Sequence, residues 1–246
     1  MAQQARSHAP RGEYSADFWV AKGLEEQPST RDKFIALTID ELAKTGPHSF
    51  NATLICDLLG TTYPMVNHYF GNRDGLVAEA VATAYQRYIF GLRDAALTKS
   101  TPTERLDAWI REQLRWTIAH PGIAVVLDFP QASLEVSNVI TEKYQAGMTN
   151  LFEYNMALLM QLIRDIQNDR VSPLEFEVGQ LPRDEIMANV ALVSRASSMG
   201  LATLGAAVWL AGQHTPGTAS VETQAWRDAM AESHIALLIK LASDPL

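Results

Sequence analysis

The stretch "LICDLLGTTYPMVNHYFGNRDGLV", residues 54–77, decides the fold because it sets two short helical patterns on either side of a glycine-containing turn. Asn51 is placed to cap the first helix and Gly60 to end it, while Thr62 is placed to cap the second. Pro64 is tolerated in the first turn of the second helix, since the amide that proline lacks has no intrahelical partner there. This spacing predicts a helix-turn-helix arrangement.

The second helix, over 63–70, has the two faces that a DNA-reading helix needs. Val66 and Phe70 can anchor its inner face. Positions that face a groove need side chains that hydrogen-bond phosphates or base edges. The residues that supply such groups are Tyr63, Asn67, His68, Tyr69 and Arg73. Taken alone, a short polar and aromatic helix is more often an ordinary surface helix, so this alternative stays open.

Apolar residues at helical intervals, separated by caps and helix breakers, extend the pattern over the rest of the chain. The expected helices run over 15–23, 29–46, 74–97, 103–120, 123–133, 137–168, 183–213 and 220–243. A loop after residue 168 carries alternating apolar residues that would also fit a brief extended stretch. The sequence has no internal repeat and no convincing set of strands, which predicts an all-α fold.

Composition narrows the class of protein. The 246 residues are 47% hydrophobic and can bury a sizeable core, and the net charge of −8 argues against a protein that coats nucleic acid indiscriminately. The single cysteine, Cys56, excludes an intramolecular disulfide framework and fits a reducing compartment. The first ten residues lack the apolar core of a secretory signal, so we expect a cytoplasmic protein. The uncharged segment 196–213 is interpreted as a buried helix rather than a membrane span.

No arrangement of residues predicts catalysis. The sequence contains no glycine-rich phosphate loop, no nucleophile elbow and no pair of histidines at metal-ligand spacing. The histidines are dispersed, and the carboxylates fall mostly on helix faces with lysine or arginine nearby, where a solvated surface explains them. We therefore expect no enzymatic activity, no cofactor and no metal site.

Residues 30–81 resemble the TetR family of transcriptional regulators. The features that carry the resemblance are a helix ending at Gly46, the turn "LGTT", the pair Tyr69 and Phe70, and the sequence "RDGL", in that order. The resemblance implies a three-helix helix-turn-helix DNA-binding domain followed by a larger helical domain for effector binding and dimerisation. The corresponding division is 1–28 for a partly disordered arm, 29–75 for DNA binding, and 76–246 for the effector and dimer domain.

The resemblance also implies a function: a ligand-responsive regulator, usually a repressor, which binds a pseudopalindromic double-stranded DNA operator as a homodimer. It places Pro64 and Met65 on or beside the DNA face, and it puts Arg73 where the family has a lysine near the backbone. One departure is Asn67, since the family usually has a tyrosine there. The full predicted DNA-binding set is Thr62, Tyr63, Pro64, Met65, Asn67, His68, Tyr69 and Arg73.

Two further surfaces are expected in the larger domain. The helix expected over 183–213 is rich in small residues, which permit close approach, and the final helix carries Trp226, Met230, Leu237 and Leu241. The resemblance implies that these two helices pair with the same helices of a second copy as a four-helix bundle, although an intramolecular core also explains their residues. Aromatic and methionine residues of the central helices suggest a site for a small, largely apolar effector, although ordinary core packing also explains each of them. These residues are Trp109, Trp116, Phe129, Met148, Phe152, Met156 and Met187.

A rival interpretation keeps the dimeric scaffold but gives it protein partners, with weak or absent DNA binding. Its support is the charge of segment 29–75, which is net −1, and the amide at Asn67. Arg6 and Arg11 of the leading arm are placed to reach a minor groove, as the arms of other helix-turn-helix proteins do, but an unattached tail is the favoured interpretation. The sequence alone leaves the operator and the effector unidentified.

Overall fold

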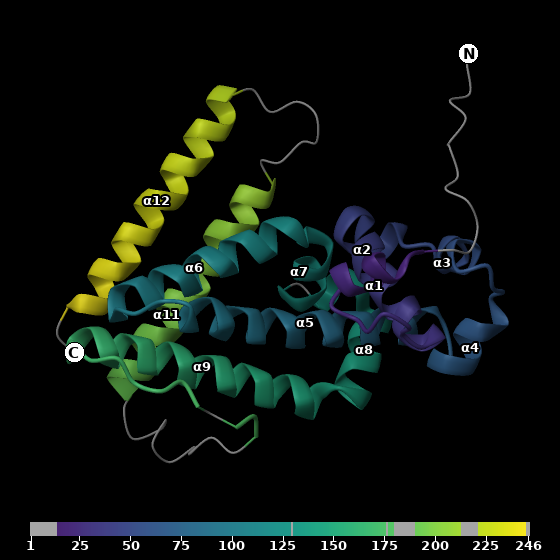
Figure 1. Ribbon diagram of the computed structural model, residues 1–246, viewed down its shortest axis with the longest axis horizontal. Helices are drawn as coiled ribbons and strands as arrows, with labels where there is room; N and C mark the ends of the chain where they lie inside the picture. Colours follow the sequence, from purple (N-terminus) through teal and green to yellow (C-terminus); the bar gives the residue numbers. More distant parts are fainter. Residues whose placement is uncertain (1–13, 129, 176, 180–189, 213–220, 245–246) are drawn as a thin grey trace. The chain divides into compact units, whose positions relative to one another are not determined.

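A computed structural model describes residues 14–128, 130–175, 177–179, 190–212 and 221–244 (Figure 1). Every regular element in these ranges is helical, which confirms the all-α class, and the described part of the loop after residue 168 contains no strand. The helices are α1 (Ala16–Ala21), α2 (Thr30–Ser49), α3 (Ala52–Leu58), α4 (Pro64–Phe70), α5 (Arg73–Leu97), α6 (Pro102–Ala119), α7 (Pro121–Asp128), α8 (Leu134–Lys143), α9 (Gln145–Gln167), α11 (Val190–Gly212) and α12 (Val221–Ser243), with a 3-10 turn, η1 (Pro130–Ser133).

The chain divides into two compact units. The first runs up to Ala84 and includes Val125–Tyr144, and the second contains Tyr85–Ala124 and the chain from Gln145 onward. Helix α5 contributes its first half to the first unit and its second half to the second. The expected division between a DNA-binding segment, 29–75, and an effector and dimer segment, 76–246, stays a prediction. It concerns what each segment binds, and these two units do not test that.

Local capping signals place the first helices as expected. The hydroxyl oxygen of Ser15 accepts a hydrogen bond from the amide of Phe18 at 3.2 Å, which caps α1. Ser29 accepts the amide of Asp32 in the same way, which caps α2. The helical path of α2 breaks at Gly46, where φ is 69°, and one further turn follows. Ser15 and Ser29 are the first residues of the ranges expected for these helices, so both expected starts and the expected break at Gly46 are confirmed.

Helix α1 is docked on the first unit through an aromatic cluster. Trp19 is 3% exposed, and it makes an edge contact with Phe18, whose ring stacks on Tyr14 at 4.2 Å. Lys33 of α2 lies over the Trp19 ring, with its Nζ 5.5 Å from the ring centroid. Residues 1–13 of the leading arm lie outside the described residues, whereas α1, which belongs to the segment 1–28, packs on α2 through Trp19.

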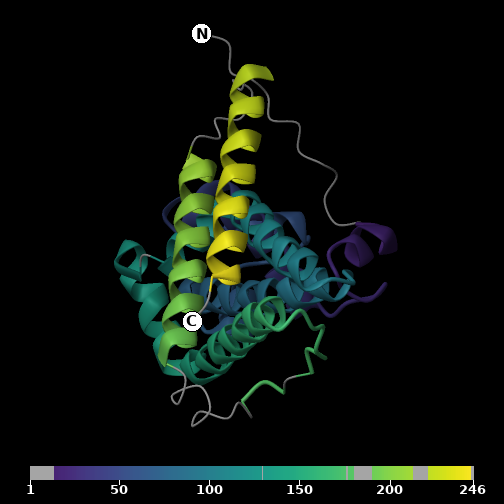
Figure 2. The same ribbon diagram turned by 90° about the vertical axis from the view of Figure 1, so that its left-hand side faces the viewer.

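In the second unit, α6 packs against α9, α11 and α12, and Figure 2 shows α11 and α12 side by side. A capping box starts α6: Thr101 accepts the amide of Glu104 at 3.3 Å, and the Glu104 carboxylate accepts the amide of Thr101. The Arg111 guanidinium of α6 then donates to both carboxylate oxygens of Glu232 on α12, at 2.5 and 2.8 Å. This ion pair joins α12 to α6.

Two expectations about helices are wrong. The single helix expected over 137–168 is two helices, α8 and α9, separated at Tyr144, where φ is −119°. The Tyr144 hydroxyl donates to Glu79 of α5 at 3.2 Å, a tertiary contact that helical periodicity does not reveal. The helix interpreted as buried, α11, is covered by its own chain along one face only. The buried residues, which are 28% of the window Val190–Ala207, are Leu192, Ala196, Met199, Thr203 and Ala207, whereas Leu201 is 70% exposed. By length and composition alone, this window would suffice to cross a membrane.

The C-terminal end of α9 depends on a buried carboxylate. Asp165 is 1% exposed and accepts hydrogen bonds from Gln161 Nε2 at 2.7 Å and from the amide of Ser172 at 2.8 Å. Arg105 of α6 donates to the carbonyl of Ser172 from the other side, at 2.8 Å. Asp165 therefore folds the loop after α9 back onto the helix.

We expect Asp165→Ala to lower the free energy of unfolding by about 2 kcal/mol, because it leaves the partly buried amide of Ser172 without its acceptor. Urea denaturation followed by circular dichroism measures the change. Glu175→Ala is the control, since Glu175 is an exposed carboxylate of the same loop and its removal should change stability by less than about 0.5 kcal/mol. Equal effects of the two substitutions would contradict the role given to Asp165.

Candidate nucleic-acid interface

The turn between α3 and α4 is built by backbone hydrogen bonds around Gly60. Asn51 caps α3 by accepting the amide of Thr53 at 3.0 Å, as expected. At the other end, the amide of Thr61 donates to the carbonyl of Cys56 at 2.9 Å, and the amide of Gly60 donates to Asp57 at 3.2 Å. This is a Schellman motif, which requires a left-handed residue, and Gly60 supplies it with φ of 62°.

Helix α4 starts without a side-chain cap. Pro64 occupies the first turn, as expected, but the residue at the cap position is Tyr63, and no side chain accepts a hydrogen bond there. The carbonyls of Thr62 and Tyr63 accept the amides of Met65 and Val66 at 3.0 and 2.9 Å instead. The prediction that the Thr62 side chain caps this helix is therefore wrong: the cap position is Tyr63, and the first turn is closed by backbone carbonyls alone.

Helix α4 has an apolar inner face and a polar outer face. Val66 is fully buried and Phe70 is 6% exposed, with the Phe70 ring 5.9 Å from that of Phe34 on α2. The predicted DNA-binding residues with exposed side chains are Thr62, Tyr63, Pro64, Asn67 and His68. Met65 and Tyr69 are half-buried at the edge of this set. Figure 1 shows α4 at one end of the first unit.

Arg73 makes its hydrogen bonds within the chain. Its guanidinium donates to the carbonyls of Pro47 and Phe50, which end α2, and to the Asp74 carboxylate at 2.8 Å. It also lies over the Phe50 ring, with Cζ 5.5 Å from the ring centroid. Arg73 therefore ties the end of α2 to the start of α5, and a phosphate contact at this position would compete with these bonds.

Most cations in the described residues 14–84 have partners within the chain. These residues include five lysines and arginines: Lys22, Arg31, Lys33, Lys44 and Arg73. Lys22 pairs with Asp40, Arg31 with Glu79 and Arg73 with Asp74, and Lys33 lies over Trp19. The outer face of α4 therefore offers neutral hydrogen-bonding groups rather than a basic patch. Arg6 and Arg11 lie outside the described residues.

Five of the seven residues predicted to bind an effector lie on two helices of the second unit. Trp109 and Trp116 are buried on α6, where the indole of Trp109 donates to Asn155 Oδ1 at 3.2 Å, and the Trp116 ring contacts Tyr88 and His120 at 4.4 and 4.7 Å. Met148, Phe152 and Met156 are spaced four residues apart on α9. Phe129 and Met187 lie outside the residues whose side chains are described.

The expectation that Phe152 belongs to an aromatic interior is wrong, because its side chain is 55% exposed. Met148 and Met156, one turn to either side of it, are half-buried. These three residues of α9 therefore form an apolar stripe that is partly exposed to solvent, whereas the two tryptophans of α6 are buried.

Sequence reasoning did not single out the buried polar groups of the first unit. Glu79 is 8% exposed and accepts from both Arg31 and Tyr144. Burial, together with the charge of Glu79 and the hydrogen bond to it, raises the pKa of Tyr144 to about 12, so its hydroxyl remains a donor at neutral pH. The sequence held one signal of this buried group: Glu79 is a carboxylate that stands among apolar residues near the start of α5.

Within the described residues, no group of three or more histidine, cysteine, aspartate or glutamate side chains could hold a metal ion. A scan against protein-family models and a search of curated proteins both gave no match to this chain.

Proposed function

We propose that the protein is a ligand-responsive transcriptional regulator of the TetR type that represses by binding a pseudopalindromic operator as a homodimer. The observation that carries this proposal is the polarity of α4. Val66 and Phe70 hold the helix to the unit, while Tyr63, Asn67 and His68 face solvent one turn apart. A helix that follows a tight turn and presents hydrogen-bonding groups outward has the features required for reading the major groove.

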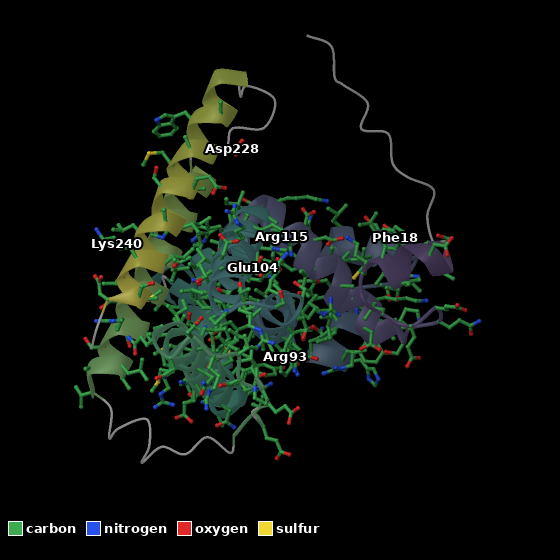
Figure 3. The ribbon with its side chains drawn as sticks, turned by 60° about the vertical axis from the view of Figure 1, so that its left-hand side comes forward. Phe18, Arg93, Glu104, Arg115, Asp228 and Lys240 are labelled. Carbon is green, nitrogen blue, oxygen red and sulfur yellow. The ribbon has the colours of Figure 1, made fainter. Side chains whose placement is uncertain are left out.

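The homodimer is supported by uncovered apolar surface on α11 and α12. Leu201 of α11 is 70% exposed, and a Cβ atom built on Gly205 would meet no atom within 4 Å. On α12, an exposed stripe at helical spacing consists of Trp226, Met230, Ser233, Leu237 and Lys240. Figure 3 shows the side chains of this helix, with Asp228 and Lys240 labelled toward opposite ends. A second copy that brings the same two helices would bury these surfaces as a four-helix bundle.

Dimerisation compensates for the weak charge of each reading head. Two heads held at one helical repeat of DNA engage successive major grooves, so that the second contact becomes intramolecular. We propose that a small, largely apolar effector binds near Trp109 and Trp116 and favours a geometry of the dimer that does not fit this spacing. The free energy by which the effector weakens DNA binding cannot exceed the difference between its binding free energies for the two geometries of the dimer.

The first test is whether the protein binds a pool of random-sequence duplex DNA at low salt. Fluorescence anisotropy of the labelled DNA measures this binding. A regulator of this kind binds the pool weakly and releases it as salt is raised, because phosphate contacts displace counterions. Absence of binding at the lowest salt would instead support the rival function, a dimer that acts through protein partners. The pairing of Lys22, Arg31 and Arg73 with carboxylates is the observation that favours the rival.

Substitution of Asn67 tests direct reading by α4. Because asparagine can make a bidentate contact with adenine, Asn67→Ala should weaken binding to a selected operator by about ten- to a hundredfold. Its side chain is exposed, so stability should not change. Gln86→Ala, which removes an exposed amide from α5, is the control and should leave affinity unchanged. Equal affinity of the Asn67→Ala variant and the unsubstituted protein would exclude Asn67 from the interface.

A further inference from the structure

Glu79 of α5 joins two elements that are far apart in the sequence. Its carboxylate is 8% exposed, forms an ion pair with Arg31 in the first turn of α2, and accepts the Tyr144 hydroxyl at 3.2 Å. A buried carboxylate is stable only when it is paired and hydrogen-bonded. Arg31 and Tyr144 therefore share one buried carboxylate as their partner.

Arg31 extends the connection to α4. Its guanidinium carbon lies 5.5 Å from the centroid of the Phe70 ring, within the range of a cation–π interaction. Phe70 is the last residue of α4, and it is 6% exposed. The group that neutralises Glu79 therefore also covers the aromatic anchor at the C-terminal end of α4.

Tyr144 lies where the chain passes from one unit to the other. It is the last residue of the first unit and separates α8 from α9, and Gln145 begins α9 in the second unit. Any displacement of the first turn of α9 acts on the backbone of Tyr144 through one peptide bond. The tyrosine hydroxyl is thus bound to the first unit while its chain continues into the second.

We propose that Tyr144, Glu79, Arg31 and Phe70 form a coupling chain through which the junction of α8 and α9 sets the position of the C-terminal end of α4. Tyr144 and Glu79 act as positioning residues. When the tyrosine hydroxyl leaves Oε2 of Glu79, the carboxylate retains one partner, and the Arg31 guanidinium, which is bound to Oε1, turns to bind Oε2 as well and moves away from the Phe70 ring. The proposed function supplies the use of this chain, which is the transmission of an effector signal to the DNA-reading helix.

Amide hydrogen exchange of the full chain, read by mass spectrometry, tests the coupling without DNA or effector. The reporters are the amides of residues 68–71, which close the last turn of α4. Tyr144→Phe should speed their exchange by about three- to tenfold, the factor expected for loss of one hydrogen bond. Tyr14→Phe, which removes a hydroxyl from the aromatic cluster of α1, is the control and should leave these amides unchanged.

A double substitution separates coupling from general destabilisation. In a Glu79→Leu background, Tyr144→Phe should have no further effect on the α4 amides, because the carboxylate that connects them is gone. Glu79→Met, which also removes the acceptor and has a similar length, replaces Glu79→Leu if the leucine variant does not fold. The coupling would be overturned if the two substitutions accelerated exchange of the α4 amides independently, so that their factors multiplied in the double variant. It would also be overturned if Tyr144→Phe accelerated exchange equally in α2, α3 and α4, or left exchange in α4 unchanged. If the coupling is observed but no duplex DNA is bound, the proposed function fails and the coupling stands.

Discussion

Gly75→Ala is expected to lower the free energy of unfolding by about 3 kcal/mol, at the upper end of the range for overpacked sites. A Cβ atom on residue 75 would lie 2.0 Å from the carbonyl oxygen of Phe70 and 3.1 Å from its carbonyl carbon. Both are backbone atoms, so a change of side-chain rotamer cannot relieve the clash. The end of α4 must move away from the start of α5, and the amide of residue 75 must shift from Asn72 Oδ1, which it contacts at 2.8 Å.

The matched control is Gly91→Ala in the same helix. A Cβ atom there would meet Glu112 Oε1 at 3.4 Å, the end of a flexible side chain. Because alanine favours an α-helix over glycine by about 1 kcal/mol, Gly91→Ala should leave stability unchanged or raise it. Urea denaturation of the two variants should therefore give changes of opposite sign. A Gly75→Ala variant as stable as the unsubstituted protein would contradict the close packing of α4 against α5.

Leu237→Glu is expected to convert a dimer into a monomer and to weaken operator binding by roughly 10²- to 10⁴-fold, the gain that linkage of two sites provides. Leu237 is 63% exposed in the single chain, so a charge there should not unfold the protein. In the proposed dimer, the same charge would be buried against the apolar faces of α11 and α12 without a partner, which is unfavourable. Analytical ultracentrifugation and anisotropy with a selected operator measure the two effects.

Leu134→Glu is the corresponding control. Leu134, the first residue of α8, is 58% exposed and lies in the first unit, away from α11 and α12 in the chain. This variant should remain dimeric and bind the operator as before. If Leu237→Glu also stayed dimeric, the surface of α11 and α12 would not be the dimer interface. If analytical ultracentrifugation showed that the unsubstituted protein is a monomer in solution, the proposed dimer would be excluded.

The parts of the fold that could be predicted from the sequence are those determined by local chemistry. Ser15, Ser29 and Asn51 each accept a backbone amide two or three residues ahead, and Gly60 adopts the left-handed angles that end α3. These interactions involve neighbours in the chain, so residue type and spacing suffice to identify them. The helical class and most helix boundaries follow from the same signals.

The parts that could not be predicted depend on partners far away in the sequence. The break between α8 and α9 occurs at Tyr144, whose hydroxyl contacts a carboxylate 65 residues earlier. Arg73 had the expected position near the end of the candidate reading helix, but its hydrogen bonds go to carbonyls of Pro47 and Phe50. A pattern can locate a side chain on a helix, whereas its acceptors are known only when the packing of the helices is known.

The candidate sites illustrate the same division. The alternation of inner and outer residues on α4 was evident from the sequence, because Val66 and Phe70 are four residues apart. By contrast, Phe152 has an apolar side chain at helical spacing and is nevertheless exposed. Periodicity groups residues on one face of a helix, but it does not say whether another helix, a second copy or solvent covers that face.

The decisive measurement for the proposal that a homodimer reads DNA with α4 is selection of bound duplexes from a random pool, because it examines the reading helix, the symmetry of the dimer and sequence preference in one experiment. We expect enrichment of an inverted repeat whose half-sites are separated by about one helical turn of DNA, or a small multiple of it. Recovery of a pool with no enriched sequence, or of a site without two-fold symmetry, would contradict it.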